Sequence, residues 1–261
     1  MSDWRRAVVT GASSGIGEAF ARRLGADGTD LVLVARSADT LQRLADELGE
    51  RSGVTVEVCA ADLTTPDGCA TVAARLADDT APVDLLVNNA GIGTSGAFGS
   101  IELQREVDLI ALNVTAVVRL THAAVARMRA QGRGGIINVS SLTAFQPYPF
   151  GANYGASKAY VTSFSKALHT ELAGTGVGVL ALCPGFTRTN FQSAAGISRT
   201  PIPDWLWLQP EEVVDEGLAA LAAGRSVRVP GAAFKAWAGL TKVVPDALIR
   251  RALASVGHRR H

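Results

Sequence analysis

Tyr154 and Lys158 stand four residues apart in the stretch NYGASKAY, which also contains several small residues. In a helix, this spacing places both side chains on one face, so the lysine ammonium would lie beside the tyrosine phenol. A free tyrosine has a pKa of ~10 and accepts protons poorly at neutral pH. A cation ~4 Å away would stabilise the phenolate by up to ~4 kcal/mol at an effective dielectric of 20, which is ~3 pKa units. The spacing predicts acid–base chemistry near neutral pH, whereas for these two residues alone an exposed helical pair is the alternative.

A glycine-rich turn, TGASSGIG, lies near the N-terminus between the strand-like stretch RAVVTG and the helix-like stretch EAFARRLGADG. Glycines let the backbone turn sharply and let N–H groups approach a phosphate, and a helix start adds positive potential. We therefore expect the turn to bind the pyrophosphate of a dinucleotide, with an ordinary strand-to-helix turn as the alternative. The expected contacts come from Gly11, Ser13, Ser14, Gly15, Ile16 and Gly17.

The end of the second strand-like stretch indicates which dinucleotide fits. Sites for NAD usually carry a carboxylate there, which binds the ribose 2′-hydroxyl. This chain has Ala35-Arg36-Ser37, so no acid repels a 2′-phosphate and Arg36 is placed to clamp one. The sequence therefore favours NADP(H) over NAD(H). The alternative is a surface arginine at a helix start that Ser37 caps.

Two further strand ends carry candidate cofactor contacts. Asp62 and Leu63 follow the third strand, where the Asp62 carboxylate would either accept a hydrogen bond from adenine or cap a helix. Asn89, Ala90 and Gly91 follow the fourth strand, where small residues would let the backbone approach the cofactor. An asparagine-rich turn is the alternative for this stretch.

Apolar, β-branched stretches alternate with amphipathic ones, and these elements must position the residues above. The strand-like stretches lie near residues 8, 33, 57, 86, 138, 180 and 228. Segments such as SADTLQRLADELGERSG and SKAYVTSFSKALHTELAG have helical patterns and fill most of the gaps. Near-continuous apolar strands indicate a sheet buried on both faces, and the alternation indicates right-handed crossovers. We expect an α/β fold with a doubly wound parallel sheet, formed by a single domain over residues 1–261, with ligands beyond the carboxyl ends of the strands.

Composition excludes several classes of function. The chain has 261 residues, is 48% hydrophobic and carries a net charge of +1, which argues against nucleic acid as a main partner. We find no leader-like apolar region and no run of 18 apolar residues, so we expect a cytoplasmic protein. Cys59, Cys69 and Cys183 are odd in number and lack CxxC spacing, which indicates reduced thiols. The four histidines form no metal-ligand pattern, so we predict no metal.

Taken in order, these motifs resemble those of the short-chain dehydrogenase/reductase family. TGxxxGxG follows the first strand, NNAG the fourth, a serine the fifth and PG the sixth, and Asn113 and YxxxK complete the set. The resemblance covers residues 5 to about 190. It implies a Rossmann-like, three-layer αβα fold.

The resemblance also implies roles for four residues. Tyr154 would be the general acid in ketone reduction and the base in alcohol oxidation, while Lys158 would lower its pKa and hold the nicotinamide ribose. Strand alternation points Ser140 and Ser141 to opposite sides, and the family's spacing, thirteen residues before the tyrosine, selects Ser141 to hydrogen-bond the substrate oxygen. Asn113 would hold a water molecule that links Lys158 to bulk solvent.

The stretch PGFTRT would complete the cofactor site by the same resemblance. Backbone near Thr187 would bind the nicotinamide carboxamide, and Thr189 would contact the carboxamide or a phosphate. A Pro-Gly turn that leaves a strand is the alternative. The cofactor contacts expected from this part of the fold are Pro184, Gly185, Thr187 and Thr189, together with Tyr154 and Lys158.

Residues 190–209 fall where the family carries the loop that covers the substrate. Their apolar side chains favour a small hydrophobic carbonyl or alcohol substrate, although packing alone would explain each one; they are Phe191, Trp205, Leu206 and Trp207. Residues 232–261 form a variable C-terminal helical tail, for which packing or subunit contact is favoured over peripheral membrane contact. The tail includes Arg250, Arg251, Arg259 and Arg260. Family members often pair through two helices, so the resemblance implies a homodimer or homotetramer.

The sequence thus predicts an NADP(H)-dependent oxidoreductase that interconverts a hydrophobic ketone or aldehyde and its alcohol. A catalytically inactive NADP-binding sensor is one alternative, against which the intact set of Ser141, Asn113, Tyr154 and Lys158 argues. An epimerase or dehydratase of the wider superfamily is another. Those enzymes usually have a different glycine spacing and a larger C-terminal domain.

Overall fold

The computed structural model describes residues 4–195 and 203–240. Within them, one sheet holds seven parallel strands in the order β3-β2-β1-β4-β5-β6-β7. Each strand coincides with a predicted stretch, so the predicted doubly wound sheet is confirmed. The strands are β1 Arg6–Thr10, β2 Asp30–Ala35, β3 Val56–Ala60, β4 Leu85–Asn88, β5 Gly134–Val139, β6 Val177–Leu182 and β7 Val227–Arg228. The tail arginines and residues 196–202 of the expected covering loop lie outside the described residues.

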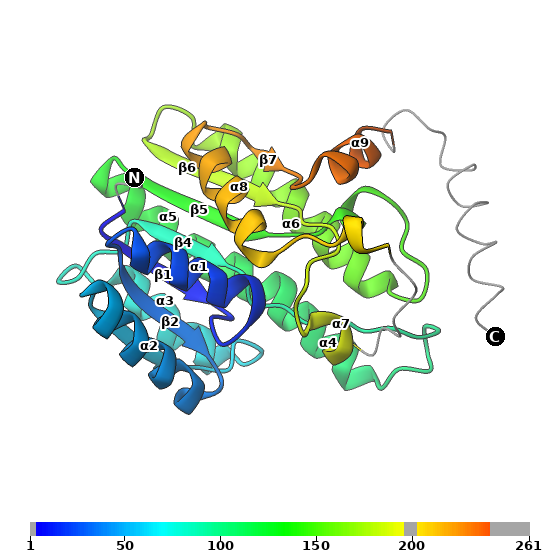
Figure 1. The fold of residues 1–261 in the computed structure, drawn as a ribbon, viewed down its shortest axis with the longest axis horizontal. Coiled ribbons are helices and arrows are strands. Elements are labelled where there is room, and N and C mark those ends of the chain that lie inside the picture. Colours follow the sequence, from blue (N-terminus) through cyan, green and yellow to red (C-terminus); the bar gives the residue numbers. More distant parts are fainter. Residues whose placement is uncertain (1–3, 196–202, 241–261) are drawn as a thin grey trace.

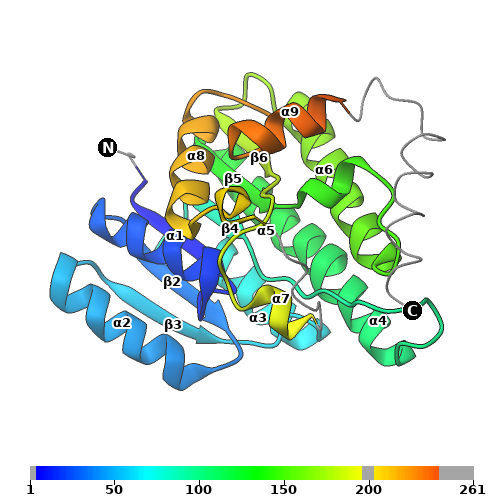
Figure 2. The same cartoon turned by 45° about the vertical axis from the view of Figure 1, so that its right-hand side comes forward.

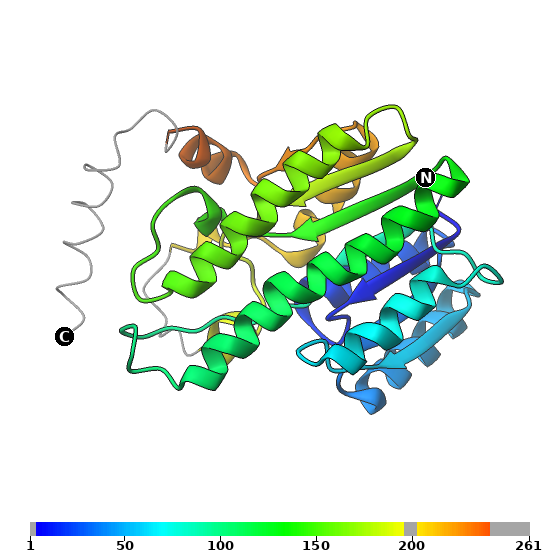
Figure 3. The ribbon, with the colours of Figure 1, turned by 180° about the vertical axis from the view of Figure 1, so that it is seen from behind.

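Helices cover both faces of the sheet and complete a three-layer arrangement. Helices α1, α2 and α8 pack on the face seen in Figure 1, and α3, α5 and α6 pack on the face seen from behind in Figure 3. The α-helices are α1 Gly15–Ala26, α2 Ala38–Ser52, α3 Pro66–Ala77, α4 Leu103–Ile110, α5 Val117–Gln131, α6 Ala152–Glu171, α7 Phe191–Ala194, α8 Pro210–Ala222 and α9 Ala232–Leu240. The shorter helices are η1 Ala111–Ala116, η2 Leu142–Phe145 and η3 Asp204–Leu206.

The strand pattern explains why both faces are buried. Successive residues of a strand point to opposite faces, so Val9 packs against α1 and α2 while Val8 packs against α3 and α5. Both are fully buried. Local signals set the helix ends: Thr65 caps α3 by accepting a hydrogen bond from Gly68 N–H, and Gly53 ends α2 in the left-handed conformation.

Helices α4, η1 and α5 form one continuous run, Leu103–Gln131, which is long and apolar enough to cross a membrane by length and composition. Its inner face packs on the sheet, however, because Leu120, Ala124 and Met128 are buried in the core. A core helix explains this apolar character.

The carboxyl ends of the strands meet at one edge of the sheet. Figure 2 shows the start of α4 and the short helix α7 lying together beyond this edge. The predicted motifs follow β1 to β6, so this arrangement brings them to the same side of the molecule.

Candidate active site

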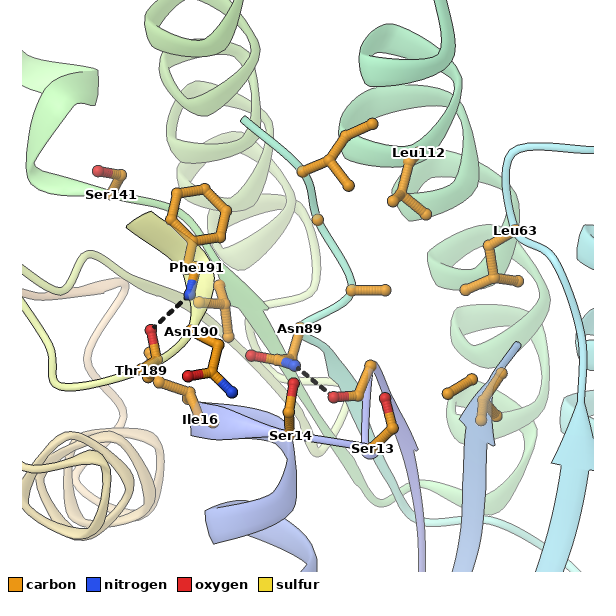
Figure 4. A pocket seen from close by; sticks show the side chains of 18 of the residues that line it. Ser13, Ser14, Ile16, Leu63, Asn89, Leu112, Ser141, Thr189, Asn190 and Phe191 are labelled. Carbon is orange, nitrogen blue, oxygen red and sulfur yellow. Dashed lines mark hydrogen bonds between the residues drawn. The ribbon is translucent and has the colours of Figure 1, made fainter. Parts of the chain in front are cut away.

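A cleft of about 710 Å³ opens at the carboxyl edge of the sheet. Figure 4 shows Ser13, Ser14 and Ile16 at the α1 side of this cleft, Leu63 and Leu112 along another wall, and Ser141 and Phe191 towards its far end. The predicted residues that line it are Gly11, Ser13, Ser14, Gly15, Ile16, Arg36, Asp62, Leu63, Asn89, Ala90, Gly91, Ser141, Tyr154, Lys158, Pro184, Gly185, Thr187 and Thr189. Gly17 and Asn113 are not among the lining residues and act from behind the wall.

The glycine turn fits closely against the end of β4. Gly11 has φ +65, a left-handed conformation that favours glycine. A Cβ atom at Gly17 would lie 2.2 Å from the Gly11 carbonyl oxygen, so any side chain there would displace the turn. Asn89 Nδ2 donates hydrogen bonds to the carbonyl oxygens of Thr10 and Gly11, and the Thr10 hydroxyl accepts one from Asn89 N–H. Asn89 therefore holds the turn in place.

The start of α1 offers backbone donors to the cleft. Ser14 stands at the N-cap position, but its side chain caps no N–H group. The first N–H groups of a helix lack partners within the helix and carry positive potential, so this start suits a phosphate. With the glycines that let a ligand approach the backbone, it meets the requirements of a dinucleotide pyrophosphate.

Arg36 and Ser37 stand at the end of β2, at the rim of the cleft. Arg36 is exposed and lines the cleft. Ser37 occupies the N-cap position of α2, but its hydroxyl donates to the Thr40 hydroxyl at 2.9 Å instead of capping an N–H group. An exposed guanidinium at this position can reach a 2′-phosphate, so the residues present fit NADP(H).

Asp62 does not cap a helix, so the second of the two alternatives given for this residue, a helix cap, is wrong. Its carboxylate accepts hydrogen bonds from Thr64 N–H at 2.9 Å and from the Thr64 hydroxyl at 2.7 Å, while Thr65 caps α3. These bonds lower the pKa of Asp62, and the nearby Arg36 charge lowers it further. Asp62 is therefore an ionised acceptor in the cleft wall, and a contact with adenine stays a prediction.

Helix α6 presents Tyr154 and Lys158 to the cleft, while β5 and its end present Ser141. Lys158 is buried, and its Nζ atom donates to the Val139 carbonyl oxygen at 2.9 Å and lies 5.8 Å from the centroid of the Tyr154 ring. The Ser140 hydroxyl is occupied inside the fold, because it donates to the Lys158 carbonyl oxygen at 2.7 Å. Ser141 is thus the serine whose hydroxyl can serve a ligand.

The pKa of Tyr154 moves opposite to the predicted direction. Removal from water raises the pKa of Tyr154 to about 12, and hydrogen bonding by Ser141 offsets only part of this rise. Burial also lowers the pKa of Lys158 to about 8. Burial therefore has the largest effect on the phenol in this structure, and the lowering of the Tyr154 pKa by Lys158 stays a prediction. At neutral pH, Tyr154 is a protonated donor beside an ammonium.

Asn113 links η1 to the segment that follows β4, from behind the cleft wall. It lies in η1, a π-helical turn of the kind often found at functional sites. Its side chain accepts from Ile92 N–H at 3.0 Å and donates to the Ile92 carbonyl at 2.9 Å. A Cβ atom at Gly91 would lie 3.1 Å from Asn113 Oδ1 and 3.3 Å from Lys158 Nζ, so a glycine there lets the two groups converge. The predicted water link stays a prediction.

The segment after β6 lies over the glycine turn. Thr187 is buried and its hydroxyl donates to the Gly185 carbonyl at 3.2 Å, whereas Thr189 Oγ1 accepts from Phe191 N–H at 3.3 Å. A Cβ atom at Gly15 would lie 3.0 Å from Thr189 Cγ2. The stretch PGFTRT therefore borders the place expected for the phosphates and the nicotinamide.

Sequence reasoning missed several lining residues. Asp108 and Leu112 precede Asn113 by five residues and one residue on the α4–η1 run, and the helical period could have placed them at the cleft. Asn190 and Gln192 also line the cleft but carry no local signal. Of the four apolar residues named in the expected covering loop, only Phe191 lines the cleft.

The other three pack elsewhere in the described part of the chain. Trp207 packs against Phe186 in a tilted arrangement with ring centroids 5.9 Å apart, and Leu206 packs on the cluster around Phe234. Trp205 is 74% exposed. These residues therefore give no direct support for an apolar substrate, whereas Phe191 does, since its ring lies 5.6 Å from that of Tyr154.

Within residues 4–195 and 203–240, no group of three His, Cys, Asp or Glu side chains lies close enough to hold a metal ion. Cys59, Cys69 and Cys183 are free cysteines.

Comparison with known proteins gives consistent matches. Residues 5–199 match the family described as short chain dehydrogenase. A short-chain dehydrogenase from Sphingobium yanoikuyae, solved in complex with NADPH, is 38% identical with a TM-score of 0.82, covering 92% of this chain and 96% of that one. The bulky-bulky ketone specific alcohol dehydrogenase from Comamonas testosteroni is 35% identical with a TM-score of 0.80, covering 97% and 95%. Serine 3-dehydrogenase from Agrobacterium fabrum is 36% identical over 187 residues, which are 70% of this chain and 72% of that protein.

Proposed function

The chain belongs to the short-chain dehydrogenase family and is an oxidoreductase that acts on CH–OH groups, and we propose that it uses NADP(H) to interconvert a hydrophobic ketone and its secondary alcohol. The observation that carries this proposal is the convergence of Tyr154, Ser141 and Lys158 at one end of a cleft whose other end is the glycine turn. The NADPH complex of the Sphingobium relative and the exposed Arg36 support the choice of cofactor.

Residues that would hold the cofactor fall into two groups. The start of α1 and the glycine turn would bind the pyrophosphate, and Arg36 would bind the 2′-phosphate. Lys158, Thr187 and Thr189 would hold the nicotinamide half. When bound, the cofactor supplies hydride for reduction and accepts it in oxidation.

The chain's own residues would manage the proton. In reduction, the Tyr154 hydroxyl donates its proton to the carbonyl oxygen as negative charge develops there, and the Ser141 hydroxyl donates a hydrogen bond to the same oxygen. A Tyr154 pKa of about 12 keeps this donor protonated at neutral pH. The Lys158 ammonium stabilises the phenolate that forms.

Substituting Tyr154→Phe tests the assignment because it removes only the hydroxyl group. We expect kcat to fall about 10²–10⁴-fold, since a general acid contributes that much, with the Kd for NADPH nearly unchanged. Tyr160→Phe on the same helix is the matched control, because Tyr160 is exposed and lies outside the cleft. Retained turnover in Tyr154→Phe would contradict the assignment, and tight NADPH binding with no turnover of any hydrophobic ketone by the unaltered protein would favour the sensor.

We also propose a homodimer or homotetramer. Exposed apolar side chains lie on the adjacent helices α4 and α6, namely Leu103, Val107, Ile110 and Tyr160. Covering them between copies would remove apolar surface from water. Sedimentation of a monomer at all accessible concentrations would contradict this.

A further inference from the structure

Helix α4 directs a stripe of side chains towards the cleft. Arg105, Asp108 and Leu112 follow a spacing of three and then four residues, which places them on one side of the α4–η1 run. Leu112 and Asp108 line the cleft, while Asp108 and Arg105 line a second, smaller pocket of about 210 Å³ beside it. We call this second space the side pocket.

The side pocket adjoins the place where Tyr154 would donate its proton. It shares Gly91, Ile92, Asp108 and Phe191 with the cleft. The Phe191 ring reaches from Tyr154 to Gly93: its centroid lies 5.6 Å from that of Tyr154, and a Cβ atom at Gly93 would lie 3.0 Å from Phe191 Cζ. One substrate molecule could therefore extend from the cleft into the side pocket, with an apolar part of the molecule beside the Phe191 ring.

The side pocket is lined by the exposed guanidinium of Arg105 and by the half-buried carboxylate of Asp108. Asp108 accepts a hydrogen bond from Gln104 Nε2 at 2.8 Å, which satisfies part of its carboxylate. The Arg105 guanidinium makes no hydrogen bond or ion pair with any residue in 4–195 or 203–240. The buried Thr94 hydroxyl in the same wall also lacks a partner within these ranges. Within the described residues, the Arg105 guanidinium and the Thr94 hydroxyl are therefore both available as donors to a ligand in this pocket.

We propose that the side pocket binds a carboxylate at the far end of the substrate, so that the natural substrate is an oxo acid with an apolar connecting chain. This inference rests on the proposed function, since it places the ketone of the same molecule at Tyr154. Arg105 would donate to the carboxylate, and charge-assisted bonds of this kind are the strong ones. The Asp108 side chain would repel the carboxylate of the substrate, and the Asp108→Asn variant described below tests this repulsion.

The experiment compares linear oxo acids of increasing chain length with their methyl esters, with NADPH as the reductant. The measured quantity is the ratio of kcat/KM for the acid to that for its ester. For the chain length that fits, Arg105→Ala should lower this ratio about tenfold or more, because hydrogen bonds to charged groups contribute ~1.5–3 kcal/mol. The loss should appear mainly in KM, as expected for binding that is equal in the ground and transition states.

Three variants control the result. Arg105→Lys keeps the charge and should retain most of the ratio, and Asp108→Asn should raise it. Arg129→Ala removes the same charge from the far end of the same helical run, 24 residues or ~36 Å away, and should leave the ratio unchanged. Equal ratios in Arg105→Ala and the unaltered protein would overturn the inference while ester turnover upheld the proposed function. Failure of the unaltered protein to reduce any acid or ester would overturn both.

Discussion

Replacing Lys158 by methionine isolates the effect of its charge on proton transfer from Tyr154. The ammonium lies 5.8 Å from the centroid of the Tyr154 ring. At that distance and an effective dielectric of 20, a unit charge stabilises a developing phenolate by ~3 kcal/mol. Each 1.36 kcal/mol is a factor of ten in rate, so Lys158→Met should lower kcat for ketone reduction ~100-fold at pH 6–7.

The pH dependence makes this prediction specific. Burial lowers the pKa of Lys158 to about 8, so the stabilising charge is present below that pH and is lost above it. The rate of the unaltered protein should therefore fall about tenfold per pH unit above pH ~8, while the Lys158→Met rate stays nearly flat. The ratio of the two rates should shrink from ~100 at pH 6–7 to ~10 near pH 9.

The assay is the loss of reduced-cofactor absorbance at saturating NADPH and ketone. Saturation matters because Lys158 is also proposed to hold the cofactor. At saturating NADPH, a weaker binding of the cofactor by Lys158→Met does not affect the measured kcat. Lys166→Met is the matched control, since Lys166 is exposed two turns further along α6. A rate ratio near one at pH 6–7 would refute a role for the charge of Lys158, and a ratio that stays at about 100 up to pH 10 would refute its lowered pKa.

Three further predictions follow from single contacts. Arg36→Asp should raise the KM for NADPH about tenfold or more and leave that for NADH nearly unchanged, since it replaces the phosphate clamp by a repelling charge; equal effects on both would contradict the clamp. Gly17→Ala should abolish tight cofactor binding in a calorimetric titration, because its Cβ atom would lie 2.2 Å from the Gly11 carbonyl oxygen, whereas Gly49→Ala, with its nearest contact at 3.8 Å, should bind normally. Lys158→Met should raise the free energy of unfolding at pH 7 by about 2 kcal/mol, because a pKa lowered from 10.5 to about 8 costs ~3 kcal/mol and the lost bond to Val139 returns ~1. Urea unfolding should show that the difference in free energy of unfolding between the two proteins becomes smaller from pH 8 to pH 10.5. In this range the unfolded chain binds more protons than the folded one, so the unaltered protein gains stability as the pH rises.

The sheet was predictable because each strand carries its own signal. Stretches such as LVLVA, residues 31–35, contain no polar side chain, and only a sheet covered by helices on both faces buries the side chains that point to each face. The start of α6 was less predictable: its first turn holds Gly155 in a stretch of small residues without apolar periodicity. That turn is fixed by tertiary contact, since Gly155 and Gly151 pack directly against Tyr148.

The lining of the cleft was largely predictable, whereas its electrostatics were not. Strand ends converge by topology, so motifs that follow strands converge too. A pKa, by contrast, depends on how much water the whole fold removes from the group, and on the order in which neighbouring groups titrate. The spacing of Tyr154 and Lys158 gives their proximity but neither the burial of Lys158 nor its bond to Val139.

The free-energy cost of burying the Lys158 ammonium indicates that the role of this residue lies in the reaction. A buried ammonium needs several partners, yet the described residues supply one accepting carbonyl, that of Val139. The fold therefore bears a net cost of about 2 kcal/mol that a methionine of similar length would avoid. Methionine is also long and flexible, so it can fill much of the space of the lysine stem. What the lysine adds is a charge 5.8 Å from the centroid of the Tyr154 ring at the end of the cleft. At an effective dielectric of 20 this charge favours proton transfer by ~3 kcal/mol, which is of the same size as its cost to folding.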